Sequence, residues 1–415
     1  MFDETPLKMV DNRAALEDLA ARLSAAKVIG VDTESDSFHH YQEKVCLIQF
    51  SDPETDYIVD PLALDGDLSP LAPVFADPGI VKVFHGADYD IVCMKRDFHF
   101  EFRNIFDTMV SSQQLNVAKI GLGDLVERFY GIELEKKYQR HDWSERPLWP
   151  EHIEYARGDT HWLISLHEIL TRKLAKAGRL ERVLEECRLL EQREWEGRSF
   201  DPDGYLRVKT RGKVLDDTAK RVLRRLYHFR DEQARRADRP PFKVIPDEVL
   251  VEVAIAQPID DNGLDRLFPR AKSAMKRRFG AGFLAAVEGG LADDFPIPTG
   301  KARRQAPGGP PSRLSARAAE RAMEALKDWR NSLVARTADL NPMAVAANGT
   351  LKSIARMRPI NLEELARVPD VRQWQVEAYG PAILDVLERI APVAQLGSLD
   401  DEQEPTEKRK RRRRR

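Results

Sequence analysis

The 415-residue sequence has little cysteine and no long apolar run. Its three cysteines, Cys46, Cys93 and Cys187, are scattered and form no CxxC pair, which argues against a disulfide framework or a zinc site. No apolar run approaches the ~18–20 residues that a membrane span needs. The first residues are acidic and lack the basic-then-apolar plan of a signal peptide. We therefore expect a soluble cytoplasmic protein with no membrane partner.

Charge is nearly balanced overall but unevenly distributed. The net charge of −2 includes an unbroken basic run of eight residues, Lys408–Arg415, without which the chain carries 58 basic and 68 acidic residues, a balance of −10. Within that acidic body, Arg207–Lys243 holds 13 Lys and Arg against 5 Asp and Glu. Basic blocks in an acidic chain suggest a polyanionic partner, although a solvated helix face is the commoner explanation of a charge run.

The length suggests two or three domains, and the N-terminal part shows strands before helices. Three expected strands, at 28–34, 45–50 and 57–60, would form an antiparallel meander. Strands first and helices interleaved later indicate an α/β domain with a mixed sheet covered by helices. The other expected elements are strands at 80–84 and 105–108, and helices at 11–26, 85–96, 108–115, 122–130, 149–176 and 180–195.

The C-terminal half contains an internal repeat. Leu223-x2-Leu226-x2-Phe229-Arg230 matches Met323-x2-Leu326-x2-Trp329-Arg330, and Gln257-Pro-Ile-Asp260 later matches Arg358-Pro-Ile-Asn361. Each unit is expected to be a compact helical domain with a small core of its own. The expected divisions are an α/β domain at 1–196, helical domains at 197–295 and 314–396, a flexible Pro/Gly/basic linker at 296–313, and a charged, disordered tail at 397–415.

Two carboxylates end the first expected strand. Asp32 and Glu34 are two residues apart, so both side chains point to one face of the strand. Two like charges in that position are costly unless a cation neutralises them. An isolated pair of this kind is more often two solvated turn acids, so its interpretation depends on residues elsewhere in the chain.

Three further residues change that interpretation. Asp90 lies just past the strand expected at 80–84, in the first turn of a helix. Tyr155 and Asp159 are four residues apart on a helix and project from one face. If these faces converge with the acidic strand end, four carboxylates and one phenol share a single site.

Such a site predicts two divalent cations, because oxygen-only ligands select hard ions such as Mg²⁺ or Mn²⁺. Two ions ~3.5–4 Å apart support in-line displacement at phosphorus: one activates the attacking water and the other steadies the leaving 3′-oxygen. Tyr155 would orient or deprotonate that water, since a phenol near a dication has a lowered pKa. The sequence shows no Ser/His/Asp or Cys/His nucleophile set, P-loop or GxGxxG fingerprint.

Taken in order, these motifs resemble those of the DEDDy 3′–5′ exonucleases. They are Asp32-Thr-Glu34, Val45-Cys-Leu-Ile-Gln-Phe-Ser51, His85-Gly-Ala-Asp-Tyr-Asp90 and Tyr155-x3-Asp159. The segment Lys137–Leu148 is similar to one that marks the ribonuclease D branch, although that branch usually has Ser where this chain has His141. The helical repeats resemble HRDC domains, and two copies are the bacterial ribonuclease D arrangement. The resemblance spans roughly residues 10–395.

The resemblance implies a ribonuclease H-like mixed sheet and a metal-dependent 3′–5′ exoribonuclease that releases nucleoside 5′-monophosphates. Its implied substrates are tRNA precursors and other small structured RNAs with single-stranded 3′ ends, and we expect a monomer. Asp90 is selected over Asp88 because the family's metal-site Asp lies five residues after the His, which leaves Asp88 as a helix N-cap candidate. The helical domains, the basic segment Arg207–Lys243 and the Arg-rich tail would hold the RNA backbone.

Some residues are candidates for contact with RNA, each with a structural alternative. The candidates are Thr33, His85, Lys137, Gln139 and Arg146. His85 could instead satisfy a backbone carbonyl, and the last three could cap or brace a loop. We expect Trp143 in the core, and Asp107 as the N-cap of the helix that starts at Thr108.

Two other functions remain open from the sequence. The same acids serve DNA exonucleases of proofreading and repair, but the absence of polymerase or helicase motifs and the segment Lys137–Leu148 favour RNA. A catalytically inactive RNA-binding adaptor is the second alternative, against which stands the presence of all four acids and Tyr155. Nuclear exosome-type exonucleases are also related, whereas the double HRDC-like repeat points to the bacterial branch.

Overall fold

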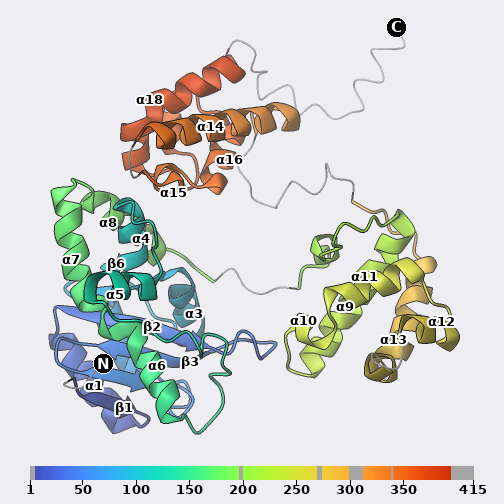
Figure 1. The fold of residues 1–415 in the computed structure, drawn as a ribbon, viewed down its shortest axis with the longest axis horizontal. Coiled ribbons are helices and arrows are strands. Elements are labelled where there is room, and N and C mark those ends of the chain that lie inside the picture. The colour runs from blue at the N-terminus through green and yellow to red at the C-terminus, as the bar shows by residue number, and fades with distance from the viewer. Residues whose placement is uncertain (1–4, 196–199, 269–272, 299–311, 338–339, 394–415) are drawn as a thin grey trace.

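The structure is a computed structural model that describes residues 5–195, 200–268, 273–298, 312–337 and 340–393. It contains an α/β domain followed by two helical domains (Figure 1). The predicted tail at 397–415, with its basic run, lies outside the described residues, as does most of the linker predicted at 296–313. Within the described ranges, no helix is long and apolar enough to cross a membrane.

A six-stranded mixed sheet forms the centre of the N-terminal domain, with strand order β1-β4-β3-β2-β5-β6. Strands β2, β3 and β4 pair antiparallel, which confirms the predicted meander, while β5 and β6 continue parallel on the other side of β2. The outer strand β1 pairs parallel with β4 and is not among the predicted strands, because four residues are too few to show a period. The strands are β1 (Leu7–Val10), β2 (Val28–Ser35), β3 (Val45–Ser51), β4 (Asp56–Val59), β5 (Val81–Phe84) and β6 (Ile105–Asp107).

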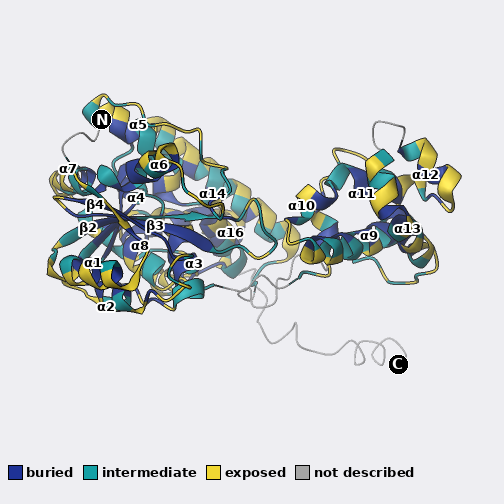
Figure 2. Cartoon of the chain, turned by 90° about the horizontal axis from the view of Figure 1, so that it is seen from below, coloured by how far each residue is buried: buried dark blue, intermediate teal, exposed yellow. Residues whose placement is uncertain are grey.

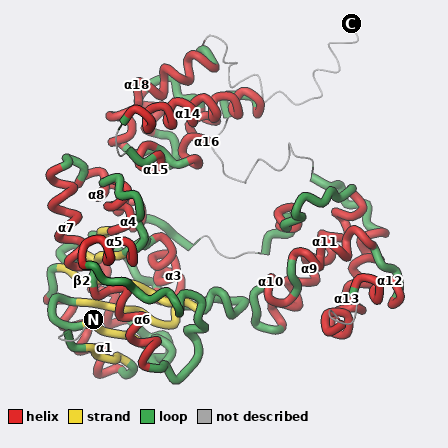
Figure 3. The backbone as a smooth tube through the Cα atoms, in the orientation of Figure 1, coloured by secondary structure: helices red, strands yellow, loops and turns green. Residues whose placement is uncertain are grey.

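Helices cover this sheet, and most match the predicted ranges (Figure 3). The helix predicted at 149–176 is two helices that meet at Trp162, where the ring lies 4.7 Å from that of Tyr130. No Gly or Pro stands at this break, and the helical pattern of apolar residues continues across it, so the sequence predicts a single helix. The helix predicted to reach residue 195 ends at Glu191. The helices are α1 (Arg13–Ala25), α2 (Ala72–Ala76), α3 (Asp88–Phe98), α4 (Thr108–Gln114), α5 (Leu122–Tyr130), α6 (Pro150–His161), α7 (Leu163–Lys176) and α8 (Leu180–Glu191), with a 3₁₀ turn η1 (Ser69–Leu71).

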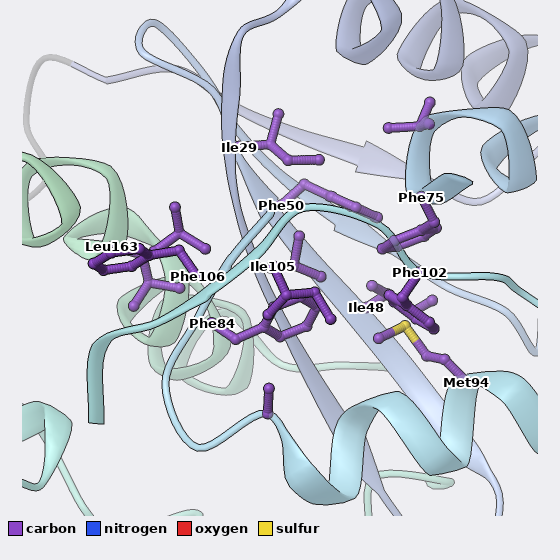
Figure 4. Packing of buried hydrophobic residues seen from close by; sticks show 14 of the residues in the cluster. Ile29, Ile48, Phe50, Phe75, Phe84, Met94, Phe102, Ile105, Phe106 and Leu163 are labelled. Atoms are coloured by element: carbon purple, nitrogen blue, oxygen red, sulfur yellow. The ribbon is translucent and has the colours of Figure 1, made fainter. Parts of the chain in front are cut away.

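Aromatic and aliphatic side chains between the sheet and its helices form the core. Figure 4 shows Phe50, Phe84 and Ile105 of three strands packed together with Phe102. Buried residues follow the sheet and the inward faces of the helices, while exposed ones lie on the outside (Figure 2). This packing fixes the strand register, since a one-residue slip would turn every core side chain to the opposite face.

The two helical domains repeat one order of elements. Arg230 and Arg330 occupy matched positions and both are buried. The Nη1 of Arg230 donates to Asp247 at 2.7 Å, and the Nη1 of Arg330 donates to Asn348 at 3.0 Å. The repeat in the sequence is therefore a repeat in the structure. The first domain contains a 3₁₀ turn η2 (Gly204–Arg207), α9 (Asp217–Arg236), α10 (Pro241–Val244), α11 (Asp247–Ala256), α12 (Asp261–Leu267) and α13 (Ser273–Leu291), and the second contains α14 (Ala316–Arg336), α15 (Pro342–Val345), α16 (Asn348–Met357), α17 (Leu362–Ala366) and α18 (Gln373–Ile390).

Candidate active site

The carboxyl end of β2 places the first two carboxylates. Asp32 pairs with Gln49 and Glu34 with Leu47 of β3, so both acids project from one face, as predicted. Gly30, two residues before Asp32, lies under the junction of α6 and α7. A Cβ at Gly30 would meet the carbonyl oxygen of Thr160 at 3.0 Å. The missing side chain therefore lets this helix junction approach β2.

Asp90 comes to the site from the first turn of α3 and is 8% exposed. The hydroxyl of Thr33 donates a hydrogen bond to its carboxylate, so Thr33 braces this acid. The prediction that Asp88 caps the helix is wrong: Ala87 holds the N-cap position, and Asp88 starts the helix and pairs with Arg193 at 2.8 Å.

Asp107 explains why α3 needs no side-chain cap of its own. It is the N-cap of α4, as predicted, and accepts from the backbone N–H groups of Met109 and Val110. The same carboxylate accepts from the N–H groups of Gly86 and Ala87, at the turn before α3. One buried acid thus satisfies donors at the start of two helices. It also fixes the turn that leads to the catalytic candidate Asp90.

Tyr155 and Asp159 lie one turn apart on α6, which is anchored by a buried network. Asp56 of β4 accepts hydrogen bonds from the Nε of Arg157 at 2.7 Å and the Nδ1 of His161 at 2.8 Å. Although burial raises its pKa, hydrogen bonds from His161, Ser51 and Arg157 hold the pKa of Asp56 below its usual range. Because Arg157 and His161 flank Asp159, the network fixes the rotation of α6.

The four acids form one electrostatic cluster. Burial, followed by the charges of Asp90, Asp159 and Glu34, raises the pKa of Asp32 well above its usual range. Burial and the charges of Asp159 and Asp90 do the same to Glu34. Burial raises the pKa of Asp90 to about 6, and burial with the charge of Asp90 raises that of Asp159 to about 7. The structure therefore brings together the four carboxylates predicted to converge.

Tyr155 completes this cluster. Burial, and then the charges of Asp159, Glu34 and Asp32, raise the pKa of the phenol above its ordinary value. The phenol therefore keeps its proton in the cation-free site, and the lowered pKa that we predict from the sequence applies only when cations are present. The ring lies 5.8 Å from that of Trp143, which is 1% exposed and belongs to the core, as predicted.

The donor set fits divalent cations. Among the described residues, the largest charge effects on the pKa values of the four carboxyls come from other acids and not from a Lys or Arg. Within the described ranges, no three His, Cys, Asp or Glu side chains are already drawn together as a chelating group. Like charges hold carboxylates apart until a cation joins them, and oxygen-only ligands suit hard ions. An ion at this position would relieve the repulsion that raises these pKa values.

A pocket of about 730 Å³ opens beside Tyr155 and Asp159. One side of the pocket is a face of α6, and the other is the segment 134–138. Of the predicted RNA contacts, Lys137 lines this pocket, with its ammonium 4.8 Å from the ring centroid of Tyr138. Gln139 is exposed and lies outside the lining.

Arg146 and His85 make their contacts within the protein. Arg146 pairs with Asp60, through two hydrogen bonds of 2.7 Å, and donates to three backbone carbonyls, so the bracing alternative accounts for its position. His85 bonds the hydroxyl of Thr108 at 2.9 Å rather than a carbonyl, and burial lowers its pKa. Contact of either residue with RNA stays a prediction.

Comparisons with known proteins agree with this geometry. Residues 7–175 match a family model described as "3′-5′ exonuclease", and residues 219–287 and 319–387 match the HRDC domain. The exosome complex exonuclease RRP6 of Saccharomyces cerevisiae is 35% identical over 275 residues, which are 63% of this chain and 37% of that protein. The chain spans about a third of the length of the curated relatives it matches.

Two solved structures are similar over more of the chain. The catalytic core of RRP6 from Trypanosoma brucei is 32% identical with a TM-score of 0.65, and the match covers 71% of this chain and 82% of that one. Escherichia coli RNase D, an exoribonuclease involved in structured RNA processing, is 25% identical with a TM-score of 0.63. That match covers 92% of this chain and 98% of that one, including both helical domains.

Proposed function

Because this chain belongs to the RRP6 and ribonuclease D family of 3′–5′ exonucleases, we propose that it removes nucleotides singly from RNA 3′ ends. In this hydrolysis the oxygen of water bonds to phosphorus, the bond from phosphorus to the 3′-oxygen breaks, and a proton reaches that oxygen. The products are a nucleoside 5′-monophosphate and a shortened RNA. The observation that carries the proposal is the cluster of four carboxylates whose pKa values are raised by burial and by one another's charges.

Each residue of the cluster has a proposed role. Asp32, Glu34, Asp90 and Asp159 would hold two divalent cations, Mg²⁺ or Mn²⁺, which when bound supply activation of water and stabilisation of the leaving oxygen. Tyr155 would orient the attacking water by a hydrogen bond through its Oη. The hydroxyl of Thr33 fixes the Asp90 carboxylate. Lys137 places a positive charge on the pocket wall, where it can meet a phosphate.

The proposed substrates are tRNA precursors and other small RNAs with single-stranded 3′ ends. Support comes from the match to a structured-RNA exoribonuclease over nearly the whole chain. The segment Arg207–Lys243 offers fewer free charges than its composition suggests, since Arg225 pairs with Asp293 and Arg235 with Asp231. The cytoplasmic location and the monomeric state stay predictions from the sequence.

The test is digestion of an RNA with a 3′ overhang, and of the matching DNA, in Mg²⁺, Mn²⁺ or EDTA. We expect metal-dependent, stepwise shortening of RNA. Asp90→Ala should slow it at least ~100-fold, because a ligand is lost. Asp88→Ala is the matched control: this acid lies two residues earlier, pairs with Arg193 on the surface, and should be dispensable. Tyr155→Phe should lose roughly 100-fold if Oη orients the water.

The alternatives predict different products. Equal or faster shortening of DNA would replace the RNA assignment with a repair-type exonuclease. The absence of any metal-dependent product from either substrate would leave an RNA-binding adaptor as the best account. Equal losses in Asp88→Ala and Asp90→Ala would show that the assay reports folding rather than cation binding.

A further inference from the structure

The loop between β2 and β3, residues 36–44, belongs to the exonuclease domain and contacts the first helical domain. We call it the docking loop. It starts two residues after Glu34 and reaches from the sheet toward α10 (Figures 1 and 3). Buried Asp36 closes the loop by accepting from the backbone N and the Nζ of Lys44, at 2.8 and 2.6 Å. The exonuclease domain itself therefore sets the shape of the docking loop.

Tyr41 anchors the docking loop in the first helical domain. Its ring packs against the hydrophobic core of that domain, 5.7 Å from the guanidinium of Arg235. Its hydroxyl donates to Asp231 of α9 at 2.8 Å, and its backbone N–H donates to Asp238 at 3.1 Å. An aromatic ring that is half-buried, with its hydroxyl bonded, is typical of an interface anchor.

His40 connects the docking loop to both sides of this contact. Its Nδ1 lies 2.7 Å from a carboxylate oxygen of Asp238, and its Nε2 lies 3.0 Å from the hydroxyl of Ser144. The Ser144 hydroxyl in turn donates to Asp142 at 2.6 Å, and the Nε2 of His40 lies 3.8 Å from a carboxylate oxygen of Asp142. His40 therefore bridges Asp238 of the first helical domain and the Ser144–Asp142 pair of the exonuclease domain.

The acceptors on the exonuclease side belong to a pocket wall. Ser144 and Asp142 lie in the segment 137–144, whose first residues, Lys137 and Tyr138, line the pocket beside Tyr155. We call this segment the pocket-wall segment. The contacts of the first helical domain therefore reach Ser144 and Asp142 through His40, and the chain leads from these residues to the pocket wall at Lys137 and Tyr138.

His39 adds a second contact of the same kind. Its Nε2 lies 2.9 Å from the carbonyl oxygen of Arg140, and its Nδ1 lies 3.4 Å from Asp142. The same nitrogen lies 3.3 Å from the Nζ of Lys243 in α10. The middle of the pocket-wall segment is thus supported by neighbouring docking-loop residues and, through them, by the first helical domain.

We propose that docking of the first helical domain positions the pocket wall, with His40 and Asp238 as positioning residues for the RNA 3′ end. This inference rests on the proposed function. When the pair is broken, the pocket-wall segment loses a support, and Lys137 and Tyr138 no longer hold a fixed place opposite Tyr155. Retention of the RNA end should weaken, whereas the acids and the phenol that carry the chemistry stay in place.

The test compares KM and kcat for the full chain on two RNAs: a trinucleotide, too short to reach the helical domains, and a long RNA with a 3′ overhang. His40→Ala and Asp238→Asn should raise KM for both substrates roughly threefold to tenfold and leave kcat within about twofold. Asp238→Glu should restore part of the effect. Glu232→Ala is the matched control, because this acid of α9 pairs with Arg236 away from the docking loop.

Three outcomes separate the ideas. A rise in KM on the long RNA alone would overturn the positioning role and make the helical domain only a surface for the RNA body. An unchanged KM on both substrates would overturn it as well. If the wild type cleaves neither RNA, the proposed function fails. The positioning role is then decided by calorimetry in EDTA, which compares the affinity of wild type and of the two variants for the trinucleotide. Asp238 is 63% exposed on its side chain, so its variant should fold normally, which thermal unfolding checks.

Discussion

Two sets of acids in the exonuclease domain differ in their neighbours: one set is paired with arginines and, in the part of the chain that the structure describes, the other is not. Members of the first set are buried and each pairs with an arginine; they are Asp52 with Arg22, Asp56 with Arg157 and Asp60 with Arg146. The second set consists of Asp32, Glu34, Asp90 and Asp159, which repel one another at the end of β2.

The pKa values follow this difference. Although burial raises them, hydrogen bonds hold the pKa values of Asp52 and Asp56 below their usual range. Burial and repulsion raise those of Asp90 and Asp159 to about 6 and about 7. A buried acid that the protein pairs with its own cation belongs to the fold. One that is left without such a partner lowers stability and is retained for what it binds.

Matched substitutions in the two sets should have the largest and most different effects, one on activity and the other on stability. Asp159→Asn removes a proposed cation ligand, so activity should fall at least ~100-fold, while stability in EDTA should not decrease. Asp56→Asn deprives Arg157 and His161 of their partner and should lower the free energy of unfolding by roughly 3–5 kcal/mol. Nuclease assays and denaturant unfolding in EDTA measure the two effects. A stable Asp56→Asn, or an unstable Asp159→Asn, would contradict the division.

The two sets should also respond to pH with opposite signs. The folded pKa of Asp159, about 7, lies above the unfolded value of ~3.9, so cation-free stability should fall as pH rises between these values. The folded pKa of Asp56 is lowered, so its contribution is present above pH ~4 and is lost on acidification.

Thermal unfolding from pH ~2 to ~8 covers both ranges and measures these opposite trends. At pH 8 in EDTA, wild type should melt below Asp159→Asn. Adding Mg²⁺ or Mn²⁺ at ~100 times its Kd should stabilise wild type by about 2.7 kcal/mol and reverse the order. If neither metal raises the melting temperature of wild type at pH 8, the cation site is refuted.

A smaller contrast separates Arg146 from Lys137. Arg146→Ala leaves buried Asp60 without its cation and should cost roughly 2–4 kcal/mol of stability. Lys137 is exposed on the pocket wall, so Lys137→Ala should leave stability within ~0.5 kcal/mol and raise KM for RNA about fivefold. Unfolding curves and steady-state kinetics, taken on both variants, check this. A pure KM effect from Arg146→Ala would restore its role as an RNA contact.

Local patterns were sufficient to predict part of the acidic cluster and much of the sheet. Alternation along β2 puts Asp32 and Glu34 on one face, and one helical turn relates Tyr155 to Asp159. The choice of Asp90 over Asp88 came from the resemblance to the exonuclease family, in which the metal-site Asp lies five residues after the His. The meander and the helical repeat follow from strand periods and from matched residues such as Arg230 and Arg330.

The remaining features depend on contacts between distant residues. Asp56 meets His161 across 105 positions and His40 meets Asp238 across 198, and no local period marks either pair. A signal for the first did exist: Arg157 and His161 flank Asp159 on a helix, and an arginine on a buried helix face needs an acidic partner. The prediction that Asp88 is an N-cap was wrong because Asp107, at the end of another strand, accepts from the backbone N–H groups of Gly86 and Ala87 before α3.

The missing side chain at Gly30 has a consequence for the ion selectivity of the proposed cation site. An alanine there would press on the backbone of Thr160, next to Asp159, and move the α6–α7 junction away from β2 by a few tenths of an ångström. The two halves of the ligand set would then separate without any ligand being altered. Magnesium takes oxygen ligands at about 2.0–2.1 Å and calcium at about 2.3–2.6 Å. One methyl group at position 30 would therefore shift the preferred ionic radius of the site toward larger ions.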